Sequence, residues 1–157
     1  MEGNMEQFYP IVLAVHNILR WIIALMIVVA LFRAYSGWLG KRDWTSLDRR
    51  VSLFLASAMD IQFLFGLILY FWLSPITRLA FQNFGAAMRE AVLRFFFLEH
   101  ALYMLVAIVL VHVGSAAARK AGEASDKHKR AALWFTLALL AILLGMPWGR
   151  PLLPGLG

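Results

Sequence analysis

Four long apolar runs divide this chain, and they constrain its fold more than any other feature of the sequence. The runs cover residues 8–35, 51–73, 95–118 and 131–148. At about 1.5 Å of rise per residue, each run can form a helix that crosses a hydrocarbon core of about 30 Å, the last with little to spare. Lipid offers the backbone no hydrogen-bond partners, so the sequence predicts an all-α integral membrane protein. We expect residues 1–157 to form one domain, an antiparallel four-helix bundle.

Composition supports this class and excludes several others. Hydrophobic residues make up 62% of the chain and charged residues only 15%, which is far from the average of soluble proteins. The chain has no cysteine, which excludes disulfides, thiolate catalysis, Cys-ligated iron–sulfur clusters and covalently attached c-type haem. We expect the first run to be retained as a span, because Glu2 and Glu6 stand where a cleaved signal peptide would carry basic residues.

Basic residues gather in two of the three connections between the runs. These two connections hold nine lysines and arginines, namely Lys41, Arg42, Arg49, Arg50, Arg119, Lys120, Lys127, Lys129 and Arg130. The positive-inside rule places both connections in the cytoplasm and both chain termini outside. The net charge of +6 is therefore interpreted as a topology signal, with no nucleic-acid partner. His128 lies in the second basic connection and is predicted to be solvated.

The middle connection, "SPITRLAFQNFGAAMREAV", has a different character. It begins near Pro75 and mixes large apolar residues with Arg78 and Arg89. This mixture predicts a short interfacial helix on the outer membrane surface.

Ionisable residues inside spans are costly, and each is a candidate functional residue. If the first span begins at Phe8 and the third at Val92, His16 and His100 both lie about 12 Å below the outer surface. Two histidines at matched depth on two helices of a bundle can supply the two axial nitrogens of a haem b iron. The alternatives are that each histidine hydrogen-bonds across the bundle, or that the pair binds another macrocycle.

The remaining polar residues in the spans suggest a second set of contacts. Arg20 and Asp60 fall near the middle of the bilayer on neighbouring helices, where we expect an ion pair and, alternatively, a proton relay. A small and polar stripe in the second span predicts a close helix contact or room for a flat ring, and it consists of Ala58, Gln62, Gly66 and Tyr70. His112 lies about 18 Å further in than His100 and about 120° around the helix, so we expect a hydrogen-bonded or interfacial histidine there.

Glu99 directly precedes His100, but adjacent residues of a helix point about 100° apart. Its carboxyl group is expected either to exchange protons near the cofactor or to bond Tyr103 or Arg94.

The motifs around these residues resemble a known family. "HNILRW" at 16–21, "IQFLFGLILYF" at 61–71, "LRFFFLEH" at 93–100 and "MPW" at 146–148 are similar to small bacterial four-helix membrane proteins catalogued as cytochrome-b-like. The resemblance spans nearly the whole chain. It implies ligation of haem b and membrane electron transfer, with His16 and His100 as the iron ligands. Many members of the family carry a histidine where this chain has Asp60, which leaves the number of haems open.

Two functions follow from the sequence. In the first, the chain is a haem b electron carrier that exchanges electrons with a membrane quinol or a periplasmic partner. In the second, it is a non-catalytic transmembrane subunit of a respiratory or photosynthetic complex. The short loops offer no docking site for a soluble substrate, so we expect a carrier or a complex subunit before a stand-alone enzyme.

Overall fold

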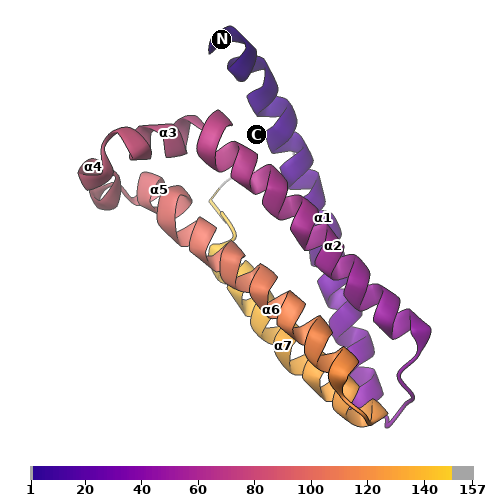
Figure 1. The fold of residues 1–157 in the computed structure, drawn as a ribbon. Helices are drawn as coiled ribbons and strands as arrows, with labels where there is room; N and C mark the ends of the chain where they lie inside the picture. Colours follow the sequence, from indigo (N-terminus) through magenta and orange to yellow (C-terminus); the bar gives the residue numbers. More distant parts are fainter. Residues whose placement is uncertain (1, 150–157) are drawn as a thin grey trace.

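The described part of the chain, residues 2–149 in a computed structural model with side chains described from Gln7 onward, consists of helices and short connections. The four long helices are α1 (Glu2–Leu39), α2 (Ser46–Ile68), α6 (His100–Lys120) and α7 (Ala124–Gly145) (Figure 1). Two π-helical turns extend two of them, Leu69–Leu73 after α2 and Phe95–Glu99 before α6.

Four helical segments are long and apolar enough to cross a membrane. They are Gln7–Leu39, Ser46–Leu73, Ala91–Lys120 and Ala124–Gly145. The prediction of a multi-pass, all-helical membrane protein is confirmed at this level. The fourth segment differs most from its predicted bounds of 131–148, because its helix begins at Ala124, within the basic connection. Met146 leaves the helix in an extended conformation, so α7 ends before Pro147.

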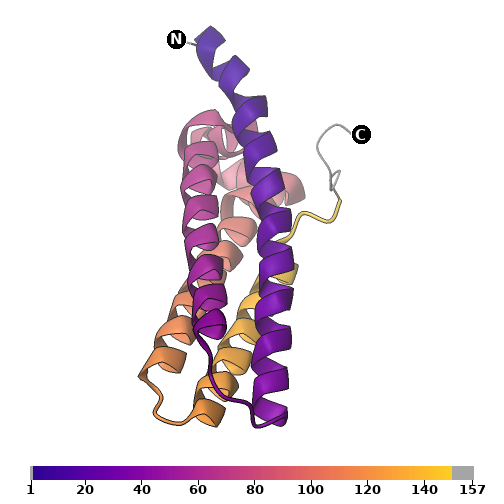
Figure 2. The same ribbon diagram turned by 90° about the vertical axis from the view of Figure 1, so that its right-hand side faces the viewer.

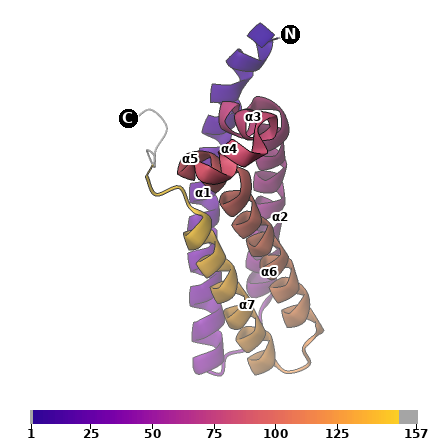
Figure 3. The ribbon, with the colours of Figure 1, turned by 90° about the vertical axis from the view of Figure 1, so that its left-hand side faces the viewer.

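The long helices form a ring in which each contacts two neighbours. Helix α1 packs mainly against α2 and α7, and α6 packs mainly against the same two helices. Helices α1 and α6 therefore face each other across the diagonal. The views in Figures 2 and 3 show that the first turns of α1 extend beyond the other helices.

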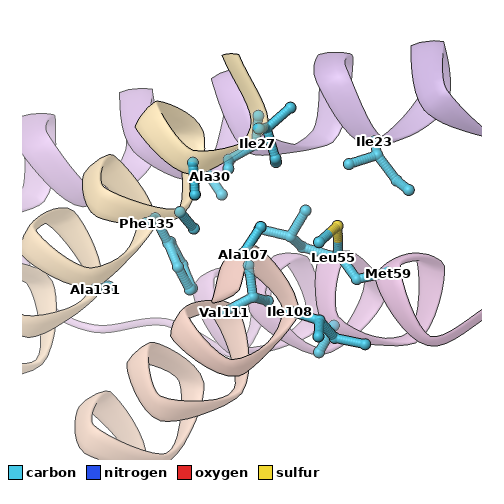
Figure 4. Close-up of a cluster of buried hydrophobic side chains, with 14 of the residues drawn as sticks. Ile23, Ile27, Ala30, Leu55, Met59, Ala107, Ile108, Val111, Ala131 and Phe135 are labelled. Carbon is cyan, nitrogen blue, oxygen red and sulfur yellow. The ribbon is translucent and has the colours of Figure 1, made fainter. Parts of the chain in front are cut away.

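The tightly packed core lies in the half of the molecule nearest the two basic connections. Its largest buried apolar side chains are Ile27, Leu55, Val111 and Phe135, one from each long helix (Figure 4). Small residues let the helices approach closely around them, namely Ala30, Ala34, Ala107, Ala118, Ala131, Ala132 and Ala138.

The opposite half is packed less closely. No residue is buried in 7–22 of α1, in 60–68 of α2 or in the stretch 91–106 that leads into α6. This half contains His16 and His100.

Three short helices close the loosely packed end. They are α3 (Pro75–Gln82), α4 (Phe84–Arg89) and α5 (Ala91–Arg94). The Tyr70 ring stacks on Phe97 at 5.7 Å, and Phe81 of α3 lies edge-on to Phe97 at 4.9 Å. The Tyr70 hydroxyl also donates to the carbonyl of Phe97 at 2.8 Å. This aromatic contact fixes the short helices above the histidine layer.

His128 corrects a prediction made from the sequence. It is 1% exposed, and its ring lies 4.8 Å from that of Trp44. The ring also packs directly on Gly37 of α1, where any side chain would overlap it. The prediction of a solvated histidine was wrong because α7 begins inside the basic connection and carries His128 on the same face as the buried Ala131 and Phe135.

Candidate bis-histidine site

His16 and His100 meet across the diagonal of the bundle. Their ring centroids lie 6.5 Å apart, with the ring planes inclined at 66°. The depth match deduced from the sequence therefore corresponds to a real approach of the two side chains. His16 comes from α1 and His100 from the first residue of α6, directly after the π-helical turn.

The hydrogen bond of His100 defines which of its nitrogens is available to a ligand. Its Nδ1 lies 2.7 Å from the carbonyl oxygen of Gly145. A carbonyl oxygen can only accept, so the proton is on Nδ1 and Nε2 keeps its lone pair. A histidine that ligates a metal usually has this arrangement, with its second ring nitrogen donating to a carbonyl or carboxylate.

The end of α7 supplies this carbonyl. Gly145 is the last residue of the helix, where backbone carbonyls have no partner within the helix. The position has no room for a side chain, since a Cβ atom would lie 2.6 Å from Met104 Cε and 2.7 Å from Tyr103 Cβ. Glycine at this position therefore lets α7 approach α6 closely enough for His100 to be bonded.

His16 is held through its backbone. Gln62 of α2 donates from Nε2 to the His16 carbonyl at 3.0 Å, as the polar stripe predicted. Gly66, one turn further along α2, faces the His16 ring, and a Cβ there would lie 3.4 Å from Cε1. Within residues 7–149, the buried atoms His16 Nδ1 and Gln62 Oε1 have no hydrogen-bond partner.

The separation of the imidazoles suits a shared metal. Two metal–nitrogen bonds of about 2 Å, with about 1 Å from each nitrogen to its ring centre, separate the two ring centres by roughly 6 Å. The observed 6.5 Å is close to this value. Within the described residues, no group of three or more His, Cys, Asp or Glu side chains is placed to bind a metal ion. A metal held here would have two protein ligands and would take its remaining ligands from another molecule, as the iron of haem does.

The residues around the pair also fit a flat macrocycle. The polar atoms without partners and the loosely packed layer are where an additional group would complete the packing. Most of the buried core lies in the other half of the molecule, and it continues toward this depth along α7 through Ala141 and Ile142 to Met146.

Glu99 adopts one of its two predicted roles. Its Oε1 accepts from Arg94 Nε at 2.7 Å, and both side chains are more than a third exposed. Arg94 and Glu99 are five positions apart, so in a regular α-helix their side chains would point about 140° apart. The intervening π-helical turn brings them to one side, because its longer i to i+5 repeat aligns residues five apart.

The predicted ion pair between Arg20 and Asp60 is wrong. Asp60 Oδ1 instead lies 2.8 Å from His112 Nε2, while Arg20 lies with its Cζ 5.6 Å from the Trp21 ring centre. Residues 60 and 62 of a helix point about 200° apart, and Gln62 already faces α1. Asp60 must therefore face away from Arg20.

His112 is hydrogen-bonded, as predicted, and its partner is Asp60. Both side chains are 50% exposed, so the pair lies on the outer surface of the bundle between α2 and α6.

No family model, curated protein or solved structure matches this chain. The resemblance to cytochrome-b-like proteins therefore stays a prediction, and the site is argued from its geometry.

Two contributors to the site were missed from the sequence. Gly145 was not among the predicted site residues, although a glycine at a helix end before "MPW" also signals an exposed carbonyl. Tyr70 was placed on the small and polar stripe, but its bond to the Phe97 carbonyl depends on the π-helical turn, which has no clear sequence pattern.

Proposed function

We propose that this protein binds haem b between His16 and His100 and transfers electrons in a membrane, alone or as a subunit of a redox complex. The observation that carries the proposal is the 6.5 Å separation of two imidazoles, one of which has its Nδ1 bonded to a backbone carbonyl. Bound haem would supply one-electron redox chemistry.

The residues of the chain have distinct parts in this function. His16 and His100 would hold the iron. The Gly145 carbonyl orients the His100 ring by accepting a hydrogen bond from its Nδ1. Gln62 fixes the backbone of His16 and hence the position of its ring. Arg94 holds Glu99 by an ion pair near the beginning of the helical segment Ala91–Lys120, which also carries His100.

The proposed setting is a bacterial inner membrane with the basic connections in the cytoplasm and the termini outside. In this orientation the bundle is antiparallel, and α3 to α5 lie at the outer surface near the histidine layer. Electrons would then be exchanged with a membrane quinol or a periplasmic protein close to that surface.

A second function is favoured by one observation. The Asp60–His112 pair is half exposed although both residues lie within helical segments that could cross a membrane, where ionisable side chains normally face protein. This exposure favours a chain that packs against another membrane subunit, with or without a haem.

The test is a reduced-minus-oxidised absorbance spectrum of the purified full chain. A b-type difference spectrum is expected, and it should disappear in His16→Ala and in His100→Ala. The matched control is His112→Ala, which removes a third histidine from the spans and should keep the spectrum. A colourless and well-folded preparation would overturn the carrier and leave the accessory subunit.

A further inference from the structure

A cavity of about 650 Å³ opens at the end of the bundle formed by the basic connections. It lies where the beginning of α2, the end of α6 and the beginning of α7 come together. The residues that matter for its chemistry are Trp44, Ser46, Arg49, Ser115, Arg119 and Lys127. This region is far from the histidine layer and has no part in the proposed electron transfer.

The charged residues that line the cavity are all basic. Arg49, Arg119 and Lys127 come from three different helices, and no acidic residue among the described ones lines the cavity. Within residues 7–149, none of these three cations forms an ion pair. Three cations brought together at one opening repel each other unless an anion joins them.

The nearest acid of α2 does not supply that anion. Asp48 is buried, and its Oδ1 accepts from Arg33 Nε at 2.8 Å. Its Oδ2 accepts from the backbone of Thr45 at 2.8 Å, which completes a capping box at the start of α2. Both oxygens of Asp48 are thus occupied, and its charge is balanced by Arg33.

The neutral groups of the cavity suit an oxyanion. Ser46 brings a hydroxyl donor, whereas the Ser115 hydroxyl already donates to the Ser52 carbonyl at 3.4 Å. Two guanidinium groups with a hydroxyl beside them match the several oxygens of a phosphate group better than a single carboxylate.

The cavity also has an apolar wall. Leu53 and the Trp44 ring line it beside the cations. Basic pockets between transmembrane helices on the cytoplasmic side are typical binding sites for acidic lipid headgroups. From the three cations, the Ser46 hydroxyl and the position of the cavity together, we propose that it binds a phosphate-bearing anion, supplied by an acidic phospholipid headgroup or by a soluble phosphate ester.

The test compares two double variants of the full chain in detergent. Arg49→Gln/Arg119→Gln removes two cations of the cavity. Arg50→Gln/Lys120→Gln removes the neighbouring cations, which are exposed in the same connections but do not line it. The melting temperature is followed while phosphatidylglycerol, phosphatidylcholine or glycerol 3-phosphate is added. A ligand that binds the folded state raises the melting temperature, and the rise grows with the logarithm of the ligand concentration divided by the dissociation constant.

Phosphatidylglycerol is expected to stabilise the unmodified protein and the Arg50/Lys120 variant at similar concentrations. The Arg49/Arg119 variant should require at least about tenfold more, since two charge-assisted contacts are lost. Stabilisation by the lipid alone identifies a phospholipid headgroup, and equal stabilisation by glycerol 3-phosphate identifies a soluble ester. No stabilisation by either, or an equal loss in both variants, would overturn the proposal.

A second comparison covers the case in which the Arg49/Arg119 variant does not fold. Lys127→Gln removes the remaining cation of the cavity, and Lys129→Gln is its control two residues away, where Lys129 Nζ lies 5.8 Å from the Trp38 ring centre. Only Lys127→Gln should weaken the response to the phosphate-bearing ligand.

Discussion

The two halves of this bundle are built from the same four helices but differ in how closely their side chains pack. The half near the basic connections is closed by alanines around Ile27, Leu55 and Phe135, which are 1% exposed or less. The half near α3 to α5 has polar side chains facing inward and no buried residue in 7–22 or 91–106. The half near the basic connections, which we call the closed half, therefore carries most of the buried core. The half near α3 to α5, which we call the open half, is where we propose that haem binds.

The largest loss of stability is expected when a large buried side chain of the closed half is truncated. Phe135→Ala should lower the free energy of unfolding by about 3–5 kcal/mol, because the ring is almost fully buried and the space cannot collapse onto rigid helix neighbours. Phe54→Ala is the control, since that ring is 62% exposed on the outer surface. Unfolding in mixed detergent micelles measures both, and equal losses would break the distinction between the core and the outer surface.

The next effect concerns the contact between α7 and His100. Gly145→Ala should lower the free energy of unfolding by about 1–3 kcal/mol, because the added Cβ would overlap Met104 and Tyr103. It should also weaken the bond from His100 Nδ1 to the Gly145 carbonyl and shift the absorbance of any bound haem. Gly149→Ala is the matched control, since nothing lies within 4 Å of a Cβ at that position. A Gly145→Ala protein with unchanged stability and spectrum would show that this approach is not needed.

A smaller effect is expected at the outer surface of the bundle. Asp60→Asn and His112→Gln each disturb a hydrogen bond of 2.8 Å, and a double-mutant cycle should give a coupling of about 0.5–1 kcal/mol. The coupling is measured from unfolding of the two single variants and the double variant in detergent. A coupling near zero would mean that the pair contributes nothing to the bundle and has some other role.

The sequence predicts the number of helices and the depth of residues along them better than it predicts the direction in which side chains point around each helix. Apolar runs fix the number of helices, and the depth of His16 and His100 follows from counting residues along two helices. Counting residues along a helix gives depth, but it does not show which neighbouring helix a side chain faces. Asp60 was assigned to Arg20 by depth, but its direction around α2 makes His112 its partner. The burial of His128 was missed for a related reason, since a charged connection conceals the start of a helix.

The smallest loss of stability is expected from the Arg94–Glu99 ion pair in the open half. Glu99→Gln removes an ion pair whose side chains are 43% and 38% exposed, so the loss of stability should be about 0–1 kcal/mol. Arg94→Gln should give the same loss, because the two residues bond each other. The informative measurement is the haem midpoint potential as a function of pH. Since Arg94 already binds the carboxylate, we expect the Glu99→Gln curve to follow that of the unmodified protein through neutral pH. A flatter curve in the variant would show that Glu99 exchanges a proton with the redox site, and would extend the proposed function from electron transfer to coupled proton transfer.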